Sequence, residues 1–126
     1  MPDEQMKEII FLNGEFLSKR QAMISPLGPG FLYGWGLFET MRARNNGIVY
    51  FDAHLKRLEK SRKLLGIERE YPQGNLKGII RKLVNINCLQ DACLRLTLSK
   101  REKGSDILVT ARRYQPYAAQ KYKQGF

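Results

Sequence analysis

The 126-residue chain carries 22 basic and 12 acidic side chains, a formal net charge of +10, and 43% hydrophobic residues. This composition excludes an intrinsically disordered chain and leaves room for one domain with a single core. No apolar run approaches the roughly 20 residues that cross a bilayer, and acidic side chains interrupt the stretch from Met1 to Arg20. We therefore expect no membrane span and no signal peptide, and predict a cytoplasmic protein.

Neither the cysteines nor the excess of positive charge indicates a specific site. Cys88 and Cys93 lack CxxC spacing and a paired histidine, so we predict apolar packing for them and expect no metal site. The basic residues fall in several separate clusters, a distribution that favours solvated faces over one nucleic-acid-binding stripe. A nucleic-acid-binding module remains an alternative that rests on the net charge alone.

The chain begins with a predicted hairpin. Glu8–Leu12 and Glu15–Ser18 are short apolar and aromatic runs joined by Asn13-Gly14, the strongest local signal for a tight turn. The next stretch contains GPGFLYGWG, and so many Gly and Pro residues predict a structured loop without a regular element.

A second hairpin and a helix follow. Leu37–Arg44 is rich in β-favouring residues, and the Asn-Asn-Gly turn after it leads into a return strand at Ile48–Tyr50. Asp52 is a candidate helix cap, and leucines at helical spacing predict a helix over Ala53–Leu65 that ends at Gly66.

The last third of the chain predicts another helix and two strands. Apolar residues at i, i+3 and i+4 spacing between Leu76 and Val84 indicate an amphipathic helix. The alternating pattern of Cys93–Ser99 and the run Asp106–Ala111 indicate paired strands. The sum is an α+β domain over residues 1–114, with a mainly antiparallel sheet of about six strands and two helices.

Few residues by themselves indicate a catalytic or ligand-binding site. His54 is the only histidine, and no nucleophile motif accompanies it, so we exclude a hydrolase triad. The glycine-rich loop is a weak candidate for a phosphate cradle, since both established phosphate-loop motifs are absent. Arg57 beside that loop could hold a phosphate, but by itself it is better explained as a surface arginine. Arg95 could project from a strand toward a substrate carboxylate, or as easily be exposed to solvent.

Three segments, taken in chain order, resemble a known family. This resemblance favours functional roles over surface roles for the two arginines. FLNGEFL, GFLYGWGLFETMRA and NNGIVYFDAHLKRLEKSRKLLGI together resemble the N-terminal half of the class IV (fold-type IV) aminotransferases, a family that depends on pyridoxal 5'-phosphate. The resemblance covers essentially the whole chain. It implies the α+β fold, the cofactor, a small-molecule substrate, a homodimer, and neither nucleic-acid nor membrane binding.

The resemblance also assigns roles to individual residues. Arg57 in HLKRL matches the arginine that holds the cofactor phosphate in this family. Tyr33 and Phe38 in YGWGLFE match positions that line the substrate pocket, and Arg95 in CLRL matches a basic position that can meet a substrate carboxylate.

The family contains aminodeoxychorismate lyases, branched-chain aminotransferases and D-amino acid aminotransferases. LFETMR and the run after it look most like the lyases, which release pyruvate from 4-amino-4-deoxychorismate to give 4-aminobenzoate, a folate precursor. Two positions depart from the family pattern. Gly28-Pro29-Gly30 stands where D-R-G is frequent, and Trp35 replaces a frequent Asp, which leaves the loop geometry and the substrate preference open.

The resemblance further implies that part of the machinery is absent. The family's covalent lysine and the acid that pairs with the cofactor ring belong to a second domain, and no lysine of this chain matches. We expect residues 115–126 to begin the linker to that domain, and the chain alone to have no catalytic residue and no activity. An assembly module that self-associates through exposed apolar surface is the remaining non-enzyme alternative.

Overall fold

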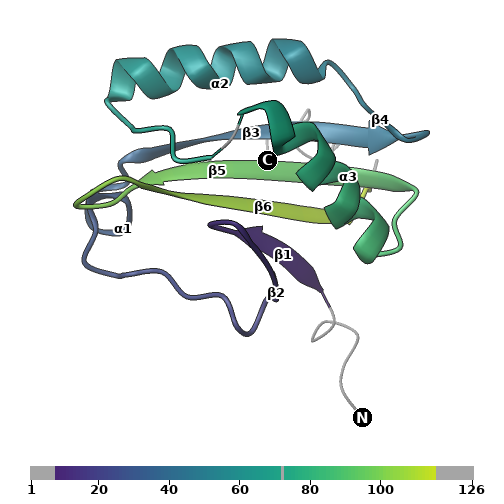
Figure 1. Ribbon diagram of the computed structural model, residues 1–126, viewed down its shortest axis with the longest axis horizontal. Coiled ribbons are helices and arrows are strands. Elements are labelled where there is room, and N and C mark those ends of the chain that lie inside the picture. The colour runs from purple at the N-terminus through teal and green to yellow at the C-terminus, as the bar shows by residue number, and fades with distance from the viewer. Residues whose placement is uncertain (1–7, 72, 116–126) are drawn as a thin grey trace.

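The structure is a computed structural model that describes residues 8–71 and 73–115. Its architecture confirms the α+β prediction: six strands form one antiparallel sheet in the order β2-β1-β6-β5-β3-β4 (Figure 1). The strands are β1 (Ile9–Leu12), β2 (Glu15–Ser18), β3 (Gly36–Arg44), β4 (Gly47–Ile48), β5 (Asp91–Lys100) and β6 (Ser105–Arg113). The helices are α1 (Pro29–Tyr33), α2 (Phe51–Leu65) and α3 (Leu76–Ile86), with a short 3-10 turn, η2 (Gln73–Asn75), before α3.

The first hairpin forms as predicted. Asn13 and Gly14 have φ angles of 48° and 94°, the left-handed conformation that a two-residue turn between twisted strands requires. The Asn13 carboxamide then fastens this turn to the far end of the chain. Its nitrogen donates to Asp106 at 2.7 Å, and its oxygen accepts from the backbone nitrogen of Ile107 at 2.8 Å.

One helix was missed, so the prediction of two helices was wrong. Pro29–Tyr33 is a five-residue helix within the glycine-rich loop. Pro29 stands at its start, where the fixed φ of proline suits a helix, and Gly34 ends it at φ 66°. A density of Gly and Pro therefore limits this helix to one turn and does not prevent it.

Two predicted boundaries also need correction. Helix α2 begins at Phe51, and its cap is Tyr50 at φ 54° with no side-chain hydrogen bond, so Asp52 lies inside the first turn. The helix ends at Gly66 with φ 68°, as predicted. The return strand is also shorter than expected, because the chain turns into α2 directly after Ile48.

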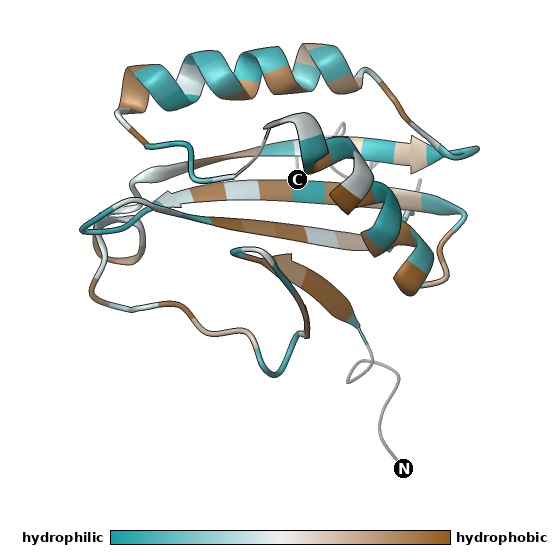
Figure 2. Cartoon of the chain, viewed as in Figure 1, coloured by the Kyte–Doolittle hydropathy of each residue, from teal (hydrophilic) through white to brown (hydrophobic). Residues whose placement is uncertain are grey.

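The core lies between the sheet and the two long helices. Leu94, Leu96 and Leu98 alternate along β5 toward the helices and are at most 1% exposed. They pack against Leu58 of α2 and Ile80 of α3, and Figure 2 shows hydrophobic residues spaced along the central strands. Burial of each such side chain stabilises the fold by about 1.5–3 kcal/mol. Helix α2 lies over β3, and α3 lies over β1 and β6 (Figure 1).

The cytoplasmic location and the interdomain linker stay predictions. Within residues 8–71 and 73–115, no helix has the length and apolar character needed to span a membrane, and the cytoplasmic location stays a prediction. The expected linker at 115–126 lies, apart from Gln115, outside the described residues.

Candidate functional site

A carboxylate on the core side of β3 organises the first group of polar side chains. The alternation of β3 places Glu39 on the helix-facing side, in line with Leu37 and Met41, and only 12% of its side chain is exposed. Helix α2 supplies two partners three residues apart. Nε of Arg57 donates to both carboxylate oxygens at 2.9 and 3.1 Å, and Nδ1 of His54 lies 3.0 Å from Oε1.

The charges of this group reinforce one another. Partial burial by itself would raise the pKa of Glu39, but hydrogen bonds and positive charge from Arg57, together with the His54 bond, lower that pKa below its usual value. The same carboxylate raises the pKa of Arg57. For the His54 contact to be a hydrogen bond, Nδ1 must carry the proton, because a carboxylate only accepts. Glu39 is therefore ionised near neutral pH and fixes the direction of the Arg57 side chain.

Arg57 keeps part of its guanidinium available for a ligand. Its Nε and Nη2 face Glu39, with Nη2 at 2.9 Å from Oε1, while 65% of the side chain is exposed. No partner of Nη1 occurs within the described residues. A guanidinium that is held on one edge and free on the other can bind a phosphate or carboxylate with two parallel hydrogen bonds.

The second group lies on the opposite face of the sheet. Phe38 precedes Glu39 in β3, so its ring points away from the helices, and it is 54% exposed. The guanidinium carbon of Arg95, on the adjacent strand β5, lies 4.0 Å from the centre of that ring. The structure thus brings two predicted substrate-pocket residues together in a cation–π contact. Tyr33 ends α1 and is 78% exposed, with no contact to either of them recorded among the described residues.

The sheet therefore separates Arg57 from Phe38 and Arg95, and the free edge of β3 is where the two faces meet. Strand β4 pairs only with Ala43 and Arg44, so within the described residues no strand covers the outer edge of β3 from Gly36 to Met41. A cleft of about 280 Å³ lies at this edge. Its lining combines both faces of the sheet: Thr40, Met41, Arg42, Val49, His54, Cys93 and Tyr114. A ligand that lies over this edge can approach both groups.

The glycines of the loop have a steric role. A Cβ at Gly36 would stand 2.6 Å from the carbonyl oxygen of Leu98, and a Cβ at Gly30 would clash with the Ser99 hydroxyl. Both glycines let the loop approach the backbone of β5. The structure thus favours close packing over a phosphate cradle as the explanation of GPGFLYGWG.

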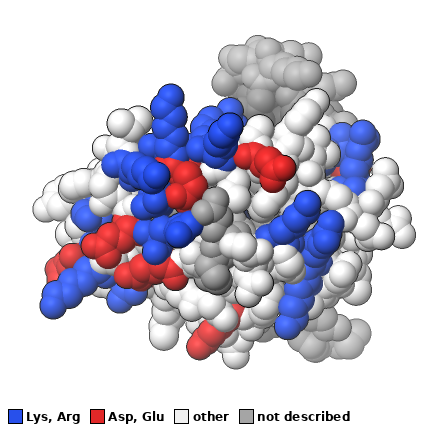
Figure 3. Space-filling view, turned by 45° about the horizontal axis from the view of Figure 1, so that its top comes forward, with Lys and Arg blue, Asp and Glu red and all other residues white. Residues whose placement is uncertain are grey.

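The surface charges do not form one continuous basic stripe on the face that Figure 3 displays. Asp and Glu lie among the Lys and Arg side chains on the left of the view, and a separate group of Lys and Arg lies on the right. The helix α2 region illustrates this, since Arg62 donates to Glu59 at 2.7 Å and Arg57 is bonded to Glu39. Among the described residues, no three His, Cys, Asp or Glu side chains are arranged to hold a metal ion.

Sequence reasoning overlooked Glu39 and His54. The alternation that predicts the strand Leu37–Arg44 also places Glu39 on its apolar face, where an unpaired carboxylate is unfavourable. That position predicts a buried cationic partner, and HLKR at the start of the next helix offers two candidates. The signal was present, but it required a pairing between two segments that only the fold brings together.

Comparison with known proteins places this architecture in a family. The family model described as amino-transferase class IV matches residues 36–125. Aminodeoxychorismate lyase of Bacillus subtilis (strain 168) is 33% identical over 106 residues, which are 84% of this chain and 36% of that protein. D-alanine aminotransferase of Staphylococcus aureus (strain N315) is 30% identical over 93 residues, or 74% of this chain and 33% of that protein.

Solved structures show the same fold. The branched-chain amino acid aminotransferase of Escherichia coli superposes with a TM-score of 0.77 at 20% identity, over 86% of this chain and 41% of that chain. Another branched-chain amino acid aminotransferase, with a TM-score of 0.78 at 24% identity, was solved with pyridoxamine 5'-phosphate. The present chain spans about a third of the length of the curated relatives it matches, 36% and 33% of the two proteins above. The family match covers most of the sequence and all the strands from β3 onward, so the chain belongs to the class IV aminotransferase family.

Proposed function

We propose that this chain forms the cofactor-phosphate side of a pyridoxal-phosphate-dependent active site, in an enzyme that resembles aminodeoxychorismate lyase. The observation that carries the proposal is the anchored Arg57. Its Nε is bonded to the largely buried Glu39 at 2.9 Å, and the opposite edge of the guanidinium faces solvent. The class IV aminotransferases depend on pyridoxal phosphate, whose ring supplies an electron sink when it is bound.

The residues present fit the phosphate of that cofactor. A dianionic phosphate needs permanently charged donors, and a guanidinium held in place by a carboxylate loses little rotational freedom when it binds. Among the described residues, the acidic side chain in contact with Arg57 is Glu39, whose charge is already shared with Arg57 and His54. Arg57 would hold the phosphate, and Glu39 and His54 would keep Arg57 in position.

We place the substrate on the other side of the β3 edge. Arg95 is exposed and rests on the Phe38 ring, so its guanidinium can turn toward a carboxylate without breaking an ion pair. Phe38 supplies aromatic surface beside it and is 54% exposed, and Tyr33, 78% exposed at the end of α1, is a second aromatic side chain open to solvent. This arrangement suits a substrate that combines a carboxylate with a ring or an apolar side chain.

Aminodeoxychorismate is our preferred substrate, with release of pyruvate to give 4-aminobenzoate. Support comes from LFETMR and from the extent of the similarity to the B. subtilis lyase, which reaches 84% of this chain. Transamination of a D-amino acid or a branched-chain amino acid is the alternative, supported by the D-alanine and branched-chain relatives. Because we expect no activity from the chain alone, the two are separated in a protein that joins this chain to the family's second domain. Pyruvate release is measured against amino-group transfer to 2-oxoglutarate in the presence of pyridoxal phosphate.

The phosphate role is tested by ligands that differ only in that group. Pyridoxamine 5'-phosphate has no aldehyde and therefore cannot react with lysines at random. We expect it to bind this chain at least about tenfold more tightly than pyridoxamine, because only the former meets Arg57. Isothermal titration or amide chemical shifts give both affinities.

Two variants of α2 provide the control. Arg57→Gln should abolish the preference for the phosphate form, whereas Lys56→Gln, which removes the same charge from the adjacent exposed position, should keep it. If Arg57→Gln and Lys56→Gln bind pyridoxamine 5'-phosphate alike, the proposed role of Arg57 is wrong.

A homodimer is part of the same proposal. Large apolar side chains between residues 23 and 35 are 41–83% exposed: Met23, Ile24, Leu27, Phe31, Leu32, Tyr33 and Trp35. So many exposed large apolar side chains within one segment are typical of an interface. Sedimentation velocity should show self-association that rises with concentration, and a monomer throughout would count against the dimer.

A further inference from the structure

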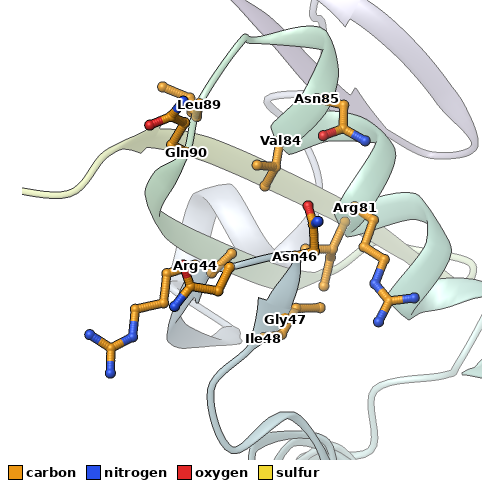
Figure 4. A pocket seen from close by; sticks show the side chains of 12 residues that line it. Arg44, Asn46, Gly47, Ile48, Arg81, Val84, Asn85, Leu89 and Gln90 are labelled. Atoms are coloured by element: carbon orange, nitrogen blue, oxygen red, sulfur yellow. The ribbon is translucent and has the colours of Figure 1, made fainter.

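A concavity unrelated to the Arg57 group lies at the other end of β3. It has a volume of about 650 Å³, within the range of roughly 300–1,000 Å³ typical of small-molecule sites. The β3–β4 turn forms one wall, and α3 with the segment after it forms the other (Figure 4). Along β3, five residues separate Glu39 from Arg44, or about 16 Å. The role of Arg57 therefore does not involve this cleft.

The lining of the cleft has one sign of charge. Two arginines, Arg44 and Arg81, are accompanied by four carboxamides, and no acidic residue is among the residues that line it. The carboxamides belong to Asn45, Asn46, Asn85 and Gln90. Two permanent positive charges beside uncharged donors favour a ligand with a negative group.

Neither arginine is held in an ion pair by the protein. Within the described residues, no ion pair or hydrogen bond is recorded for the side chains of Arg44 and Arg81. Asp91 stands opposite Arg44 in the sheet register, but both of its carboxylate oxygens are bonded to Arg42, at 2.9 and 2.6 Å. The bonds from Arg42 lower the pKa of Asp91, and the charge of Arg44 adds to that effect through space, but Arg44 makes no hydrogen bond to this carboxylate.

The floor of the cleft is apolar. Ile80 and Ala43 are buried at 0% and 6% exposure, and Ile48, Val84 and Leu89 pack partly buried beside them. In Figure 4, Arg44 and Arg81 extend on either side of the strand end at Gly47 and Ile48. An apolar group can therefore enter toward Val84 while its charged end stays at the mouth.

The β3–β4 turn, which forms one wall of the cleft, has an uncommon backbone conformation. Asn45 and Asn46 have φ angles of 54° and 62°, where glycine is the usual second residue. The carboxamide of Asn46 lies between the two arginine side chains in Figure 4. Asn46 thus occupies a position where glycine would adopt the same φ with less backbone strain, and its carboxamide faces the cleft.

We propose that the cleft between the β3–β4 turn and α3 binds a small organic anion with an apolar body, such as a medium-chain carboxylate. The carboxylate lies at the mouth of the cleft, within reach of the mobile side chains of Arg44 or Arg81 and of the carboxamides, and the apolar body lies against the partly buried Ile48 and Val84. The site follows from this lining alone and does not depend on the proposed cofactor role of Arg57.

Titration of the 126-residue chain with sodium hexanoate tests the site, with amide chemical shifts as the readout. We expect shifts concentrated at residues 44–48 and 80–90. Affinity should increase from acetate to hexanoate by roughly fourfold per buried methylene. Pentylammonium, with the same five-carbon alkyl chain and the opposite charge, should not shift these amides.

The double variant Arg44→Gln/Arg81→Gln should bind hexanoate at least about tenfold more weakly. The matched double variant Arg20→Gln/Lys103→Gln removes two exposed charges elsewhere and should bind as the wild type does. The proposal is wrong if hexanoate shifts only amides outside the cleft, if pentylammonium binds equally well, or if the two double variants behave alike.

Discussion

Arg57 and Arg95 are held in two different ways on the two faces of the sheet. Arg57 is fixed by the Glu39 carboxylate, whose side chain is 12% exposed, on the face of the sheet that the helices cover. Arg95 lies on the open face and rests on a Phe38 ring that is 54% exposed. The first contact is directional and charged, and the second allows the guanidinium to slide and turn.

The difference suits two kinds of ligand group. A cofactor phosphate returns to the same place in each catalytic cycle, so a rigid arginine is an advantage. A substrate carboxylate arrives and leaves with each turnover, which an adaptable arginine accommodates. The helix-covered face thus supplies stability and a fixed charge, while the open face supplies exposed side chains that contribute little to stability.

The strongest test of this comparison uses two neighbouring positions of β5. Leu96→Ala removes a side chain that is 1% exposed and should lower the free energy of unfolding by about 2–5 kcal/mol. Arg95→Ala, one residue away on the open face, should change it by no more than about 0.5 kcal/mol. Urea unfolding of both variants measures the difference. Equal losses of unfolding free energy would show that side chains on the open face stabilise the fold as much as side chains of the core do.

A smaller difference in unfolding free energy is expected between variants of Arg57 and variants of Glu39, the two members of the ion pair. Arg57→Leu leaves the Glu39 carboxylate with only His54 as a partner, and we expect the unfolding free energy to fall by about 1 kcal/mol from that loss at Glu39. Glu39→Leu instead places an apolar side chain beside Met41 on the apolar face and should be neutral or stabilising.

Both variants should nevertheless lose the preference for pyridoxamine 5'-phosphate, because each destroys the fixed guanidinium. Urea unfolding and ligand titration on the same samples separate stability from binding. A Glu39→Leu protein that still prefers the phosphate form would show that Arg57 needs no anchor.

The smallest expected effect is a dependence on pH. Because the pKa of Glu39 is lowered in the folded state, its contribution to stability is complete above the unfolded value, near 4.5, and is lost as the pH falls through the folded value. Glu39→Gln should therefore flatten the acid side of the stability curve below about pH 5. Urea midpoints at a series of pH values measure this slope, and Glu15→Gln, at an exposed carboxylate of β2, is the control. An unchanged slope in Glu39→Gln would contradict the anchoring role.

The sequence predicted the elements well where the signal is local. The Asn13-Gly14 turn, the end of α2 at Gly66 and the alternation of Leu94 to Leu98 all appear as expected. The predicted helix boundaries were wrong where the backbone departs from the usual preferences for helix caps and loops. Tyr50 caps α2 without a side-chain hydrogen bond, and Pro29 with Gly34 shapes a one-turn helix from a loop sequence.

The candidate site was predicted only in part. Resemblance supplied Arg57, Tyr33, Phe38 and Arg95, and their functional roles stay predictions. Neither the resemblance nor the pattern indicated Glu39 as the anchor, because the residue lies 18 positions before Arg57 in the sequence and meets it only when α2 packs on β3. Nor did it indicate that the sheet separates Arg57 from Arg95.

The sequence by itself determined the periodicity of each segment, and through it which residues form strands or helices and which side of each segment is apolar. The tertiary structure alone decided that β1 lies beside β6, that α2 covers β3, and that a lining without acidic residues surrounds the cleft between the β3–β4 turn and α3. The physical reason is that the hydrophobic effect is non-directional. An apolar stripe specifies that a face is buried, but the partner that buries it follows from the packing of the whole chain.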